Sequence, residues 1–311
     1  MSEVAIDTDL ILFVSDLDGT LLRPDATLGE RTVQVVNDLV ARGGLFTYAT
    51  ARSFTSASRV TAGLDLQLPV ITYAGAVIVD PRSGALREVA SLPPEAVLAV
   101  QQATSASASV QPILFAMHGG RDRVCWLRKH TNRFVEGFLS HRRDDPRLFP
   151  LDSWAELDEG SVFYVSIIGE QGPLQDLQES LNAQLGRCHV VFAEDIYSPG
   201  EYWLEITSAT GTKAAALQTI RRELEVHQLV CFGDNHNDLP MFATADVSLA
   251  VANAVPEVRH TATEIIGTNA TEGVAEWLAR HASQRRTAPG EPEGDDPPLG
   301  RLQSSLRQRH A

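Results

Sequence analysis

The stretch that decides the fold is LILFVSDLDGT, residues 10–20. Its first part, residues 10–14, is an apolar run too short to span a membrane and typical of a buried parallel strand. In open α/β sheets, functional groups lie just beyond the carboxyl ends of the strands. Asp16 and Asp18 would emerge there together, and two neighbouring carboxylates repel unless a cation or proton lies between them. The pair predicts a metal and catalytic site; the alternative is an Asx-rich turn after a strand.

Composition narrows the classes of partner. The chain has 311 residues, enough for two domains, and its 43% hydrophobic and 21% charged residues are ordinary for a globular protein. Asp and Glu number 40 against 26 Lys and Arg, a formal net charge of −14. Such an acidic surface disfavours nucleic acid and anionic membranes, so we expect neither as a partner. A small anionic substrate in a local cationic pocket remains compatible with it.

The cellular setting is indicated by what the sequence does not contain. No stretch approaches the roughly 18 uninterrupted apolar residues of a membrane-spanning helix, and residues 1–9 lack the basic start of a signal peptide. The three cysteines, Cys125, Cys188 and Cys231, are widely spaced and form no CxxC pair. They therefore indicate neither a disulfide framework nor a zinc site. We expect a reducing, cytoplasmic setting.

The first 80 residues alternate between expected strands and helices. A capping box at residues 27–30 introduces a helix that ends at Gly43. Strands are expected at residues 45–49 and 69–73, with a helix between them that ends near Gly63. This alternation is typical of a doubly wound parallel sheet.

The rest of the chain divides into an insertion, a return to the parallel pattern and a tail. Mixed strands and helices predict an inserted α+β domain at residues 86–192, between two parts of the core at 1–85 and 193–281. The second core part is expected to begin with a strand at 203–206. Residues 282–311 are rich in Pro, Gly and charge and are predicted to be a disordered tail. Docking of this tail to a protein partner is an open alternative.

Further polar residues follow the expected strands or open a helix. Thr50 follows the second strand, Lys213 opens a helix, and residues 233–238, GDNHND, follow the late strand 229–232. In a doubly wound sheet these groups would face one crevice together with the two acids. Carboxylates for a hard metal ion, with an ammonium, a hydroxyl and loop amides for phosphate oxygens, are the groups that Mg²⁺-assisted phosphoryl transfer needs.

In this order, the four elements resemble those of the haloacid dehalogenase-like (HAD) hydrolases, and more closely their Cof-type, sugar-phosphatase-like subgroup. The matching residues are DLDGTL at 16–21, TAR at 50–52, GTK at 211–213 and GDNHND at 233–238. Asn253 and the segment 272–274 are similar to the family's later signatures, and the resemblance covers roughly residues 10–280. It implies a Rossmann-like core with an inserted α/β cap of the C2B type.

The resemblance implies the chemistry residue by residue. Asp16 would attack phosphorus and form an aspartyl-phosphate, while Asp18 would protonate the leaving oxygen and then activate water. Mg²⁺ would be held by Asp16, the Asp18 backbone carbonyl and Asp234, with Asp238 completing or orienting its shell. The expected function is a phosphoric monoester hydrolase acting on a small phosphorylated metabolite, for instance a sugar phosphate.

The family pattern also implies a phosphate-binding set: Thr50, the Ala51 amide, Lys213 and Asn237. Each has a simpler interpretation: Thr50 could cap the next helix, and Lys213 could be a solvated residue in a helix's first turn. Asn253 could only shape a turn, and Arg52 receives no chemical role.

Further residues carry weaker signals. His236 is more simply a solvent-facing side chain, and residues Trp126, Arg128, Lys129 and His130 of the insertion are more simply ordinary surface residues than substrate contacts. The chain also departs from the subgroup's usual pattern in having Ala74 before Gly75 in place of Asn, and Ala51 in place of Gly.

Two other functions remain open at this point. A phosphomutase or phosphotransferase would use the same two acids and pass the phosphoryl group to a hydroxyl other than water. A non-catalytic regulatory protein of the same fold would have lost a nucleophile or a metal ligand, whereas all of them are present here.

Overall fold

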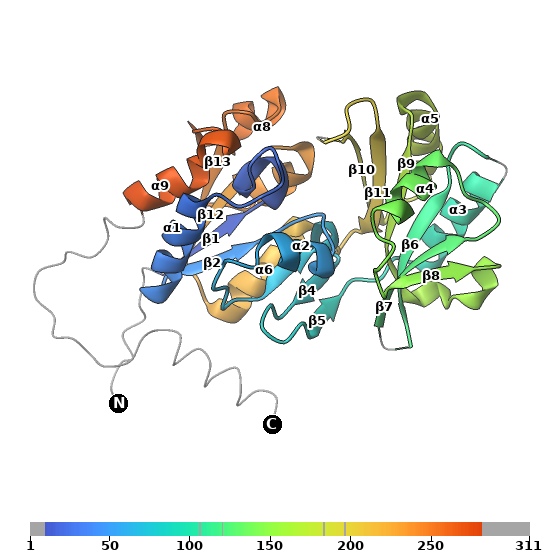
Figure 1. Ribbon diagram of the computed structural model, residues 1–311, viewed down its shortest axis with the longest axis horizontal. Coiled ribbons are helices and arrows are strands. Elements are labelled where there is room, and N and C mark those ends of the chain that lie inside the picture. Colours follow the sequence, from blue (N-terminus) through green and yellow to red (C-terminus); the bar gives the residue numbers. More distant parts are fainter. Residues whose placement is uncertain (1–9, 106, 120, 183, 196, 282–311) are drawn as a thin grey trace, which may run out of the picture. The chain divides into compact units, whose positions relative to one another are not determined.

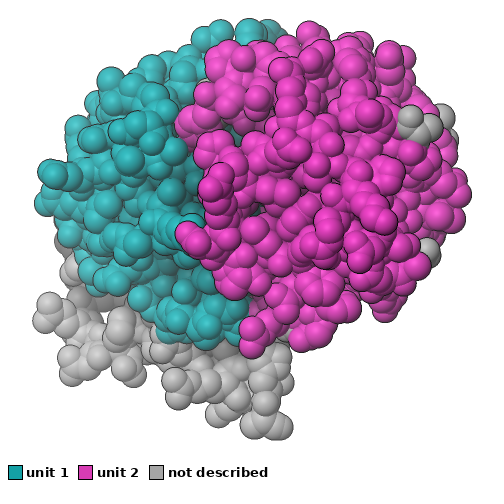
Figure 2. Space-filling model, turned by 45° about the vertical axis from the view of Figure 1, so that its right-hand side comes forward, with its two compact units in different colours: residues 1–72, 79–85, 217–311 teal, residues 73–78, 86–216 magenta. Residues whose placement is uncertain are grey.

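The computed structural model describes residues 10–105, 107–119, 121–182, 184–195 and 197–281 (Figure 1). The predictions for residues 1–9 and for the tail at 282–311 lie outside these residues. The chain divides into two compact units, coloured in Figure 2. Unit 1 consists of Met1–Thr72, Val79–Ala85 and Leu217–Ala311, and unit 2 of Tyr73–Ile78 and Leu86–Ala216.

Unit 1 is built on a parallel five-stranded sheet. Its strands, in spatial order, are β14 (Glu264–Ile266), β13 (Val247–Val251), β12 (Gln228–Gly233), β1 (Ile11–Ser15) and β2 (Leu45–Tyr48). Every neighbouring pair is parallel. The doubly wound α/β core expected from the sequence is confirmed.

The order of the strands places a topological switch point beside β1. The next strand along the chain, β2, pairs with one edge of β1, while β12, more than 200 residues later, pairs with the other. In open α/β sheets the carboxyl ends of strands at such a switch point border the ligand site. Leu12 and Val14 of β1 are fully buried, as expected for a central strand with both faces covered.

Helices connect and cover these strands. Those with residues in unit 1 are α1 (Glu30–Ala41), α2 (Phe54–Val60), α6 (Lys213–Leu224), α7 (Leu239–Phe242), α8 (Pro256–Thr261) and α9 (Gly273–His281). Helix α9 contacts α1, and its Trp277 ring packs edge-on against Phe13 of β1 and Phe232 of β12. The last helix therefore covers the two strands that border the switch point.

Unit 2 contains a mixed six-stranded sheet. In spatial order its strands are β10 (Cys188–Glu194), β11 (Tyr202–Ser208), β9 (Val162–Gly169), β6 (Pro112–His118), β7 (Arg121–Leu127) and β8 (Leu148–Leu151). Its helices are α3 (Pro94–Ser105), α4 (Arg133–Ser140) and α5 (Gln171–Asn182). A third sheet, which is not confined to unit 2, has the order β3 (Val70–Thr72), β4 (Val77–Val79) and β5 (Leu86–Val89). The predicted α+β character of the insertion is confirmed.

One strand assignment was wrong. The strand predicted at residues 203–206 was expected to resume the parallel core sheet. It is instead part of β11, which pairs antiparallel with β9 and β10 of the six-stranded sheet. Leu204 and Ile206 pack into the core of that sheet. An apolar run of this length has the same pattern in either kind of sheet, so periodicity alone does not assign its partners.

Helix α4 and strand β8 of unit 2 were not predicted from the sequence. Helix α4 begins at the N-cap Asn132, whose side chain accepts hydrogen bonds from the backbone N–H groups of Phe134 and Val135, a start signal that the sequence does contain. Strand β8 includes Pro150, a residue type that is disfavoured in central strands. It lies at the edge of the sheet, where a missing N–H donor is tolerated.

The described helices include none long and apolar enough to cross a membrane. The three cysteines are free thiols, as expected, and burial raises the pKa of Cys231 well above its ordinary value, with the Asp238 charge adding to the effect. Cys231 therefore behaves as a small buried hydrophobe. The cytoplasmic setting stays a prediction.

The start of α1 is capped by a residue from the far end of the chain. The predicted capping box was wrong: the N-cap is Gly29, and the Thr27 hydroxyl donates to Asp25 instead. The Glu272 carboxylate accepts from the Thr32 backbone N–H at 2.7 Å and from its hydroxyl at 2.8 Å. It also pairs with Arg23 at 2.5 Å, so one carboxylate joins α1, the loop after β1 and the start of α9.

We expect Gly29→Ala to destabilise the protein. A Cβ at this position would lie 2.0 Å from the Glu272 carboxylate. The displaced Glu272 would lose its bonds to α1, at a cost of about 1 kcal/mol, typical of a lost helix cap. As a control, Gly137→Ala in α4 meets no atom within 4 Å and should stabilise by about 0.5–1 kcal/mol. Urea unfolding measures both, and equal shifts would contradict this packing.

The stabilisation by Glu272 should depend on pH. Burial acts to raise its pKa, but hydrogen bonds from Arg23 and Thr32 outweigh it and hold the pKa below the ordinary value of 4.5. A carboxyl with a lowered folded pKa stabilises the fold fully above its unfolded pKa and loses this effect as the pH falls through its folded pKa. In thermal melts, Glu272→Gln should lower Tm at neutral pH, and the difference from wild type should narrow at acidic pH. A constant difference would contradict the linkage.

Candidate active site and metal centre

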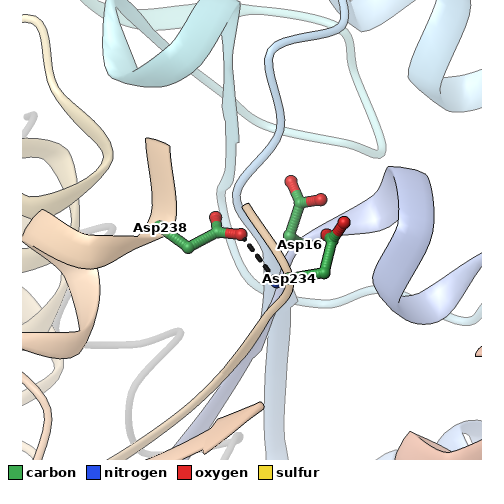
Figure 3. A group of neighbouring side chains, drawn as sticks. All are labelled: Asp16, Asp234 and Asp238. Carbon is green, nitrogen blue, oxygen red and sulfur yellow. Dashed lines mark hydrogen bonds between the residues drawn. The ribbon is translucent and has the colours of Figure 1, made fainter. Parts of the chain in front are cut away.

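Three carboxylates converge at the switch point (Figure 3). Asp16 follows β1 directly, Asp234 follows β12, and Asp238 ends the short turn η5 (His236–Asp238). One oxygen from each lies within 4.8 Å of the others. Asp16 and Asp234 are 6% exposed and Asp238 is fully buried. The predicted meeting of Asp16, Asp234 and Asp238 is therefore observed in the structure.

The chemistry of this donor set fits a divalent cation. Three carboxylates removed from water at this separation repel one another strongly unless positive charge or protons lie between them. Carboxylate oxygens are the ligands preferred by Mg²⁺ among the common biological ions. The buried cluster is thus suited to hold Mg²⁺.

The loop after β1 is shaped to fit against Asp234. Gly19 has φ +79°, and a Cβ there would lie 2.3 Å from the Asp234 carboxylate, so only glycine suits the position. The next residue, Thr20, donates its hydroxyl to Asp234 at 2.7 Å. One Asp234 oxygen is thereby fixed by the same loop that carries Asp16.

The loop after β12 is organised by Asp238. One of its oxygens accepts hydrogen bonds from the backbone N–H groups of Asp234, at 2.9 Å, and of Asn235, at 3.1 Å. Asp238 therefore holds the backbone of Asp234 in place as well as contributing a carboxylate. Asn237 lies in the same turn, and its side-chain carbonyl oxygen is buried with no hydrogen-bond partner among the described residues.

Asn253 supports the loop that carries Asp16. The sequence analysis left open whether this residue only shapes a turn. Its side chain donates to the backbone carbonyl of Gly19 at 2.8 Å and accepts from the backbone N–H of Asn269 at 2.9 Å. The Asn269 side chain in turn donates to the carbonyl of Leu22. Two side-chain amides thus satisfy two carbonyls of this loop, and both residues lie more than 200 positions away in the sequence.

Asp18 lies two residues after Asp16, but its carboxylate has a different partner. It accepts two hydrogen bonds from the Arg52 guanidinium, 2.6 Å from Nε and 2.5 Å from an Nη. It is not a member of the three-carboxylate cluster. Arg52 received no role in the sequence analysis, although it belongs to the matched triplet at residues 50–52.

Thr50 is buried at the end of β2. Its backbone N–H donates to the carbonyl of Ile71, and its hydroxyl accepts from the backbone N–H of Arg52. The N-cap of the next helix is Ser53, so the simpler interpretation of Thr50 as that cap is wrong. Ala51 joins these two residues.

Lys213 lies in unit 2, where it is 2% exposed at the first residue of α6. The alternative of a solvated first-turn lysine is therefore wrong. In the same unit, burial raises the pKa of Glu205, while a hydrogen bond from Tyr164 and the positive charge of Lys213 act in the opposite direction. Gly75 packs so closely on the start of α6 that a Cβ would lie 2.3 Å from the Lys213 backbone nitrogen.

Other residues singled out in the sequence lie at the surface. His236 is exposed, as expected, with Nδ1 3.3 Å from a Glu257 oxygen. Arg128, Lys129 and His130 are also exposed, and Trp126 is half-buried. Their interpretation as substrate contacts remains untested.

The metal centre predicts how the Tm of Asp234→Asn compares with that of wild type, first without metal and then with Mg²⁺. Without metal, Asp234→Asn removes one of three repelling charges, so its Tm should equal or exceed that of wild type. With Mg²⁺, wild type should gain Tm and the variant should gain little, since a ligand that binds only the folded state stabilises it, by about 2.7 kcal/mol at a hundredfold excess over Kd.

The control for this experiment is Asp38→Asn, which changes an exposed acid on α1. It should respond to Mg²⁺ as wild type does. Equal Mg²⁺-induced shifts in wild type and Asp234→Asn would contradict the metal centre.

Two curated relatives match most of the chain. An HMP-PP phosphatase from Serratia proteamaculans (strain 568) is 30% identical over 270 residues, which cover 85% of this chain and 92% of the relative. A 5-amino-6-(5-phospho-D-ribitylamino)uracil phosphatase from Bacillus subtilis (strain 168) is 25% identical over 282 residues, which cover 89% of this chain and 100% of the relative.

Solved structures share the fold. TM0651 from Thermotoga maritima matches with a TM-score of 0.68 at 25% identity, over 86% of this chain and 96% of its own. BT1666 from Bacteroides thetaiotaomicron, a phosphatase of the haloalkanoate superfamily by its description, matches with a TM-score of 0.70 at 16% identity, over 91% and 99%.

The family model of the haloacid dehalogenase-like hydrolases matches residues 13–278, which include all the acids described above. The resemblance seen in the sequence is thereby confirmed over the whole described fold, and both curated relatives are phosphatases. The chain belongs to the haloacid dehalogenase-like hydrolases and is a phosphatase, a phosphoric monoester hydrolase, of the Cof-type group.

Proposed function

We propose that this protein hydrolyses a small phosphorylated metabolite in two steps, with Asp16 as the nucleophile and Asp18 as the acid and base. The observation that carries the proposal is the buried cluster of Asp16, Asp234 and Asp238 at the switch point, with Asp18 on the same loop but outside the cluster. We therefore assign Asp16, which faces the metal centre, to nucleophilic attack, and Asp18, outside the cluster, to proton transfer.

In the first step an Asp16 oxygen attacks phosphorus, and the bond between phosphorus and the leaving oxygen breaks. The Asp18 carboxyl gives its proton to that oxygen, so the product leaves as an alcohol. In the second step water attacks the phosphorus of the aspartyl-phosphate while Asp18 takes a proton from the water. The bond between phosphorus and the Asp16 oxygen breaks, inorganic phosphate leaves, and both aspartates return to their starting states.

Mg²⁺ would be held by the carboxylates of Asp16 and Asp234 and the backbone carbonyl of Asp18, with Asp238 completing or orienting the set. When bound, it would offset the repulsion between the Asp16 carboxylate and the phosphate dianion. Asp238 supports this arrangement through its hydrogen bonds to the backbone of Asp234 and Asn235.

The phosphate oxygens would be bound by four groups: Thr50, the Ala51 amide, Lys213 and Asn237. Two observations support the set. Lys213 is almost completely buried, where water screens charge weakly, so its ammonium would attract an anion strongly. Asn237 lies in the same turn as Asp238 and would donate its side-chain N–H to a phosphate oxygen.

The curated relatives support a proposal for the class of substrate. The names of both curated phosphatases denote small phosphorylated compounds, and one of them is a phosphate monoester on a ribityl chain attached to a uracil. We propose a substrate of this size class, a phosphorylated sugar or a phosphorylated sugar attached to a heterocycle.

The test is a Mg²⁺-dependent phosphate-release screen over such compounds. Wild type should release inorganic phosphate, and Asp16→Asn, which keeps the size of the side chain but removes its nucleophilic oxygen, should lose activity by at least about 10⁴-fold. Asp38→Asn on α1 controls for loss of an acid elsewhere in the unit and should keep full activity.

The same screen separates hydrolysis from the alternatives. Transfer of the phosphoryl group to another hydroxyl without release of phosphate would favour a phosphomutase or phosphotransferase. Equal release by wild type and Asp16→Asn would contradict the assignment of the nucleophile.

A further inference from the structure

The Arg52 guanidinium makes a bidentate pair with the Asp18 carboxylate, that is, one hydrogen bond to each oxygen. Nε lies 2.6 Å from one oxygen and an Nη 2.5 Å from the other, so the planar guanidinium faces the planar carboxylate. Such a paired geometry fixes orientation as well as distance, which a single hydrogen bond does not. The side chains are 19% and 24% exposed, so water screens the pair only in part.

Arg52 is itself fixed in place by the surrounding loop and helix. Its backbone N–H donates to the Thr50 hydroxyl at 3.1 Å, and its second Nη donates to the Ser56 hydroxyl at 3.2 Å. The backbone of Ser56 is held in turn by the N-cap Ser53. The guanidinium is therefore positioned by the end of β2 and the first turn of α2, two parts of unit 1.

This support matters because Asp18 sits in a loop of irregular backbone. Asp18 has φ −74° and ψ 124° and is followed by Gly19 with φ +79°, so no regular helix fixes the direction of its side chain. Asp16, two residues earlier, belongs to the carboxylate cluster, whereas Asp18 is held by Arg52. The separation of the two acids thus depends on a partner from another segment of the chain.

We propose that Arg52 is a positioning residue that sets the direction in which the Asp18 carboxyl meets the leaving oxygen of the substrate. The inference rests on the proposed function, because it assigns to Arg52 an effect on the proton that Asp18 delivers. A carboxylate oxygen has two lone pairs, so accepting one hydrogen bond from Arg52 does not prevent it from carrying the proton that passes to the leaving oxygen. Arg52 acts through Asp18 and does not touch the reacting atoms.

Phosphate esters with different leaving groups can distinguish this role from others. An alkoxide is a poor leaving group and needs the proton from Asp18, whereas para-nitrophenolate is a stable anion and leaves without one. Loss of a proton donor therefore slows alkyl esters much more than para-nitrophenyl phosphate. A residue that binds the phosphoryl group, or that only maintains the fold, affects both esters alike.

The experiment compares kcat/KM for two esters in the full-length enzyme: the best alkyl phosphate from the screen and para-nitrophenyl phosphate. Arg52→Gln should lower the value for the alkyl ester by about 10- to 100-fold and that for the aryl ester by less than about 3-fold, since positioned proton transfer contributes up to 10²–10⁴. Arg52→Lys keeps the charge but not the two-point geometry and should recover only part of the loss.

Two further variants sharpen the comparison. Asp18→Asn should show the same bias between esters, and the variant Asp18→Asn/Arg52→Gln should be no slower on the alkyl ester than Asp18→Asn alone, since Arg52 acts only through Asp18. Arg59→Gln removes an exposed arginine from the same helix, α2, and should leave both values unchanged. Equal losses on the two esters, additive losses in the double variant or faster turnover by Arg52→Gln would each overturn the proposal.

Thermal melts of wild type, Asp18→Asn, Arg52→Gln and the double variant test the contact between the two residues without any catalysis. If Arg52 holds Asp18 in solution, the Tm of the double variant will lie above the value given by adding the two single shifts. Additive shifts overturn the proposal even in an active enzyme. Absence of phosphate release by wild type from every ester overturns the proposed function instead, and with it the proton-directing role, whatever the melts show.

Discussion

Repulsion between buried carboxylates is the constraint on which the rest of this site depends. Asp16, Asp234 and Asp238 come from two neighbouring strands and a turn, and all three are withdrawn from water. Burying like charges together is unfavourable unless a cation accompanies them. The fold tolerates the cluster because Asp16 and Asp234 follow β1 and β12. The side chains of these two strands are mostly apolar and buried, so the strands are stable without the acids. The stability of the sheet thus supports an arrangement that would not form by itself.

The hydrogen bonds around the cluster show how its geometry is maintained. Thr20 fixes one oxygen of Asp234, Asp238 binds the backbone at Asp234, and Asn253 binds the carbonyl of Gly19. None of these contacts neutralises charge. They determine instead where the carboxylates lie before a cation or a substrate arrives, and such preorganisation is what makes electrostatic catalysis effective, because little rearrangement is needed during the reaction.

The sequence predicted the local parts of this site and missed those that depend on distant partners. Asp16 and Asp234 could be placed because each follows an apolar run, and parallel strands bring their carboxyl ends to one edge. The capping box before α1 was wrong because the real acceptor, Glu272, lies 240 residues from Thr32. Arg52 received no role for the same reason: its contact with Asp18 joins segments 34 residues apart and leaves no periodic signal. The strand at 203–206 was assigned to the wrong sheet because an apolar run does not identify its neighbours.

The two acids of the opening motif differ in partner, which supports the different roles proposed for them. They have the same side chain and lie two positions apart, yet Asp16 faces two other carboxylates while Asp18 faces a guanidinium. Carboxylates adjust to the charges around them, so an acid among other acids is suited to bind a cation, whereas one held by a cation outside that cluster keeps a fixed direction for proton exchange. The backbone at Asp18 and Gly19 is irregular, so the two side chains follow neither a helical nor a strand repeat. The difference in partner therefore follows from the irregular backbone of residues 17–21 and from an arginine that lies just after β2.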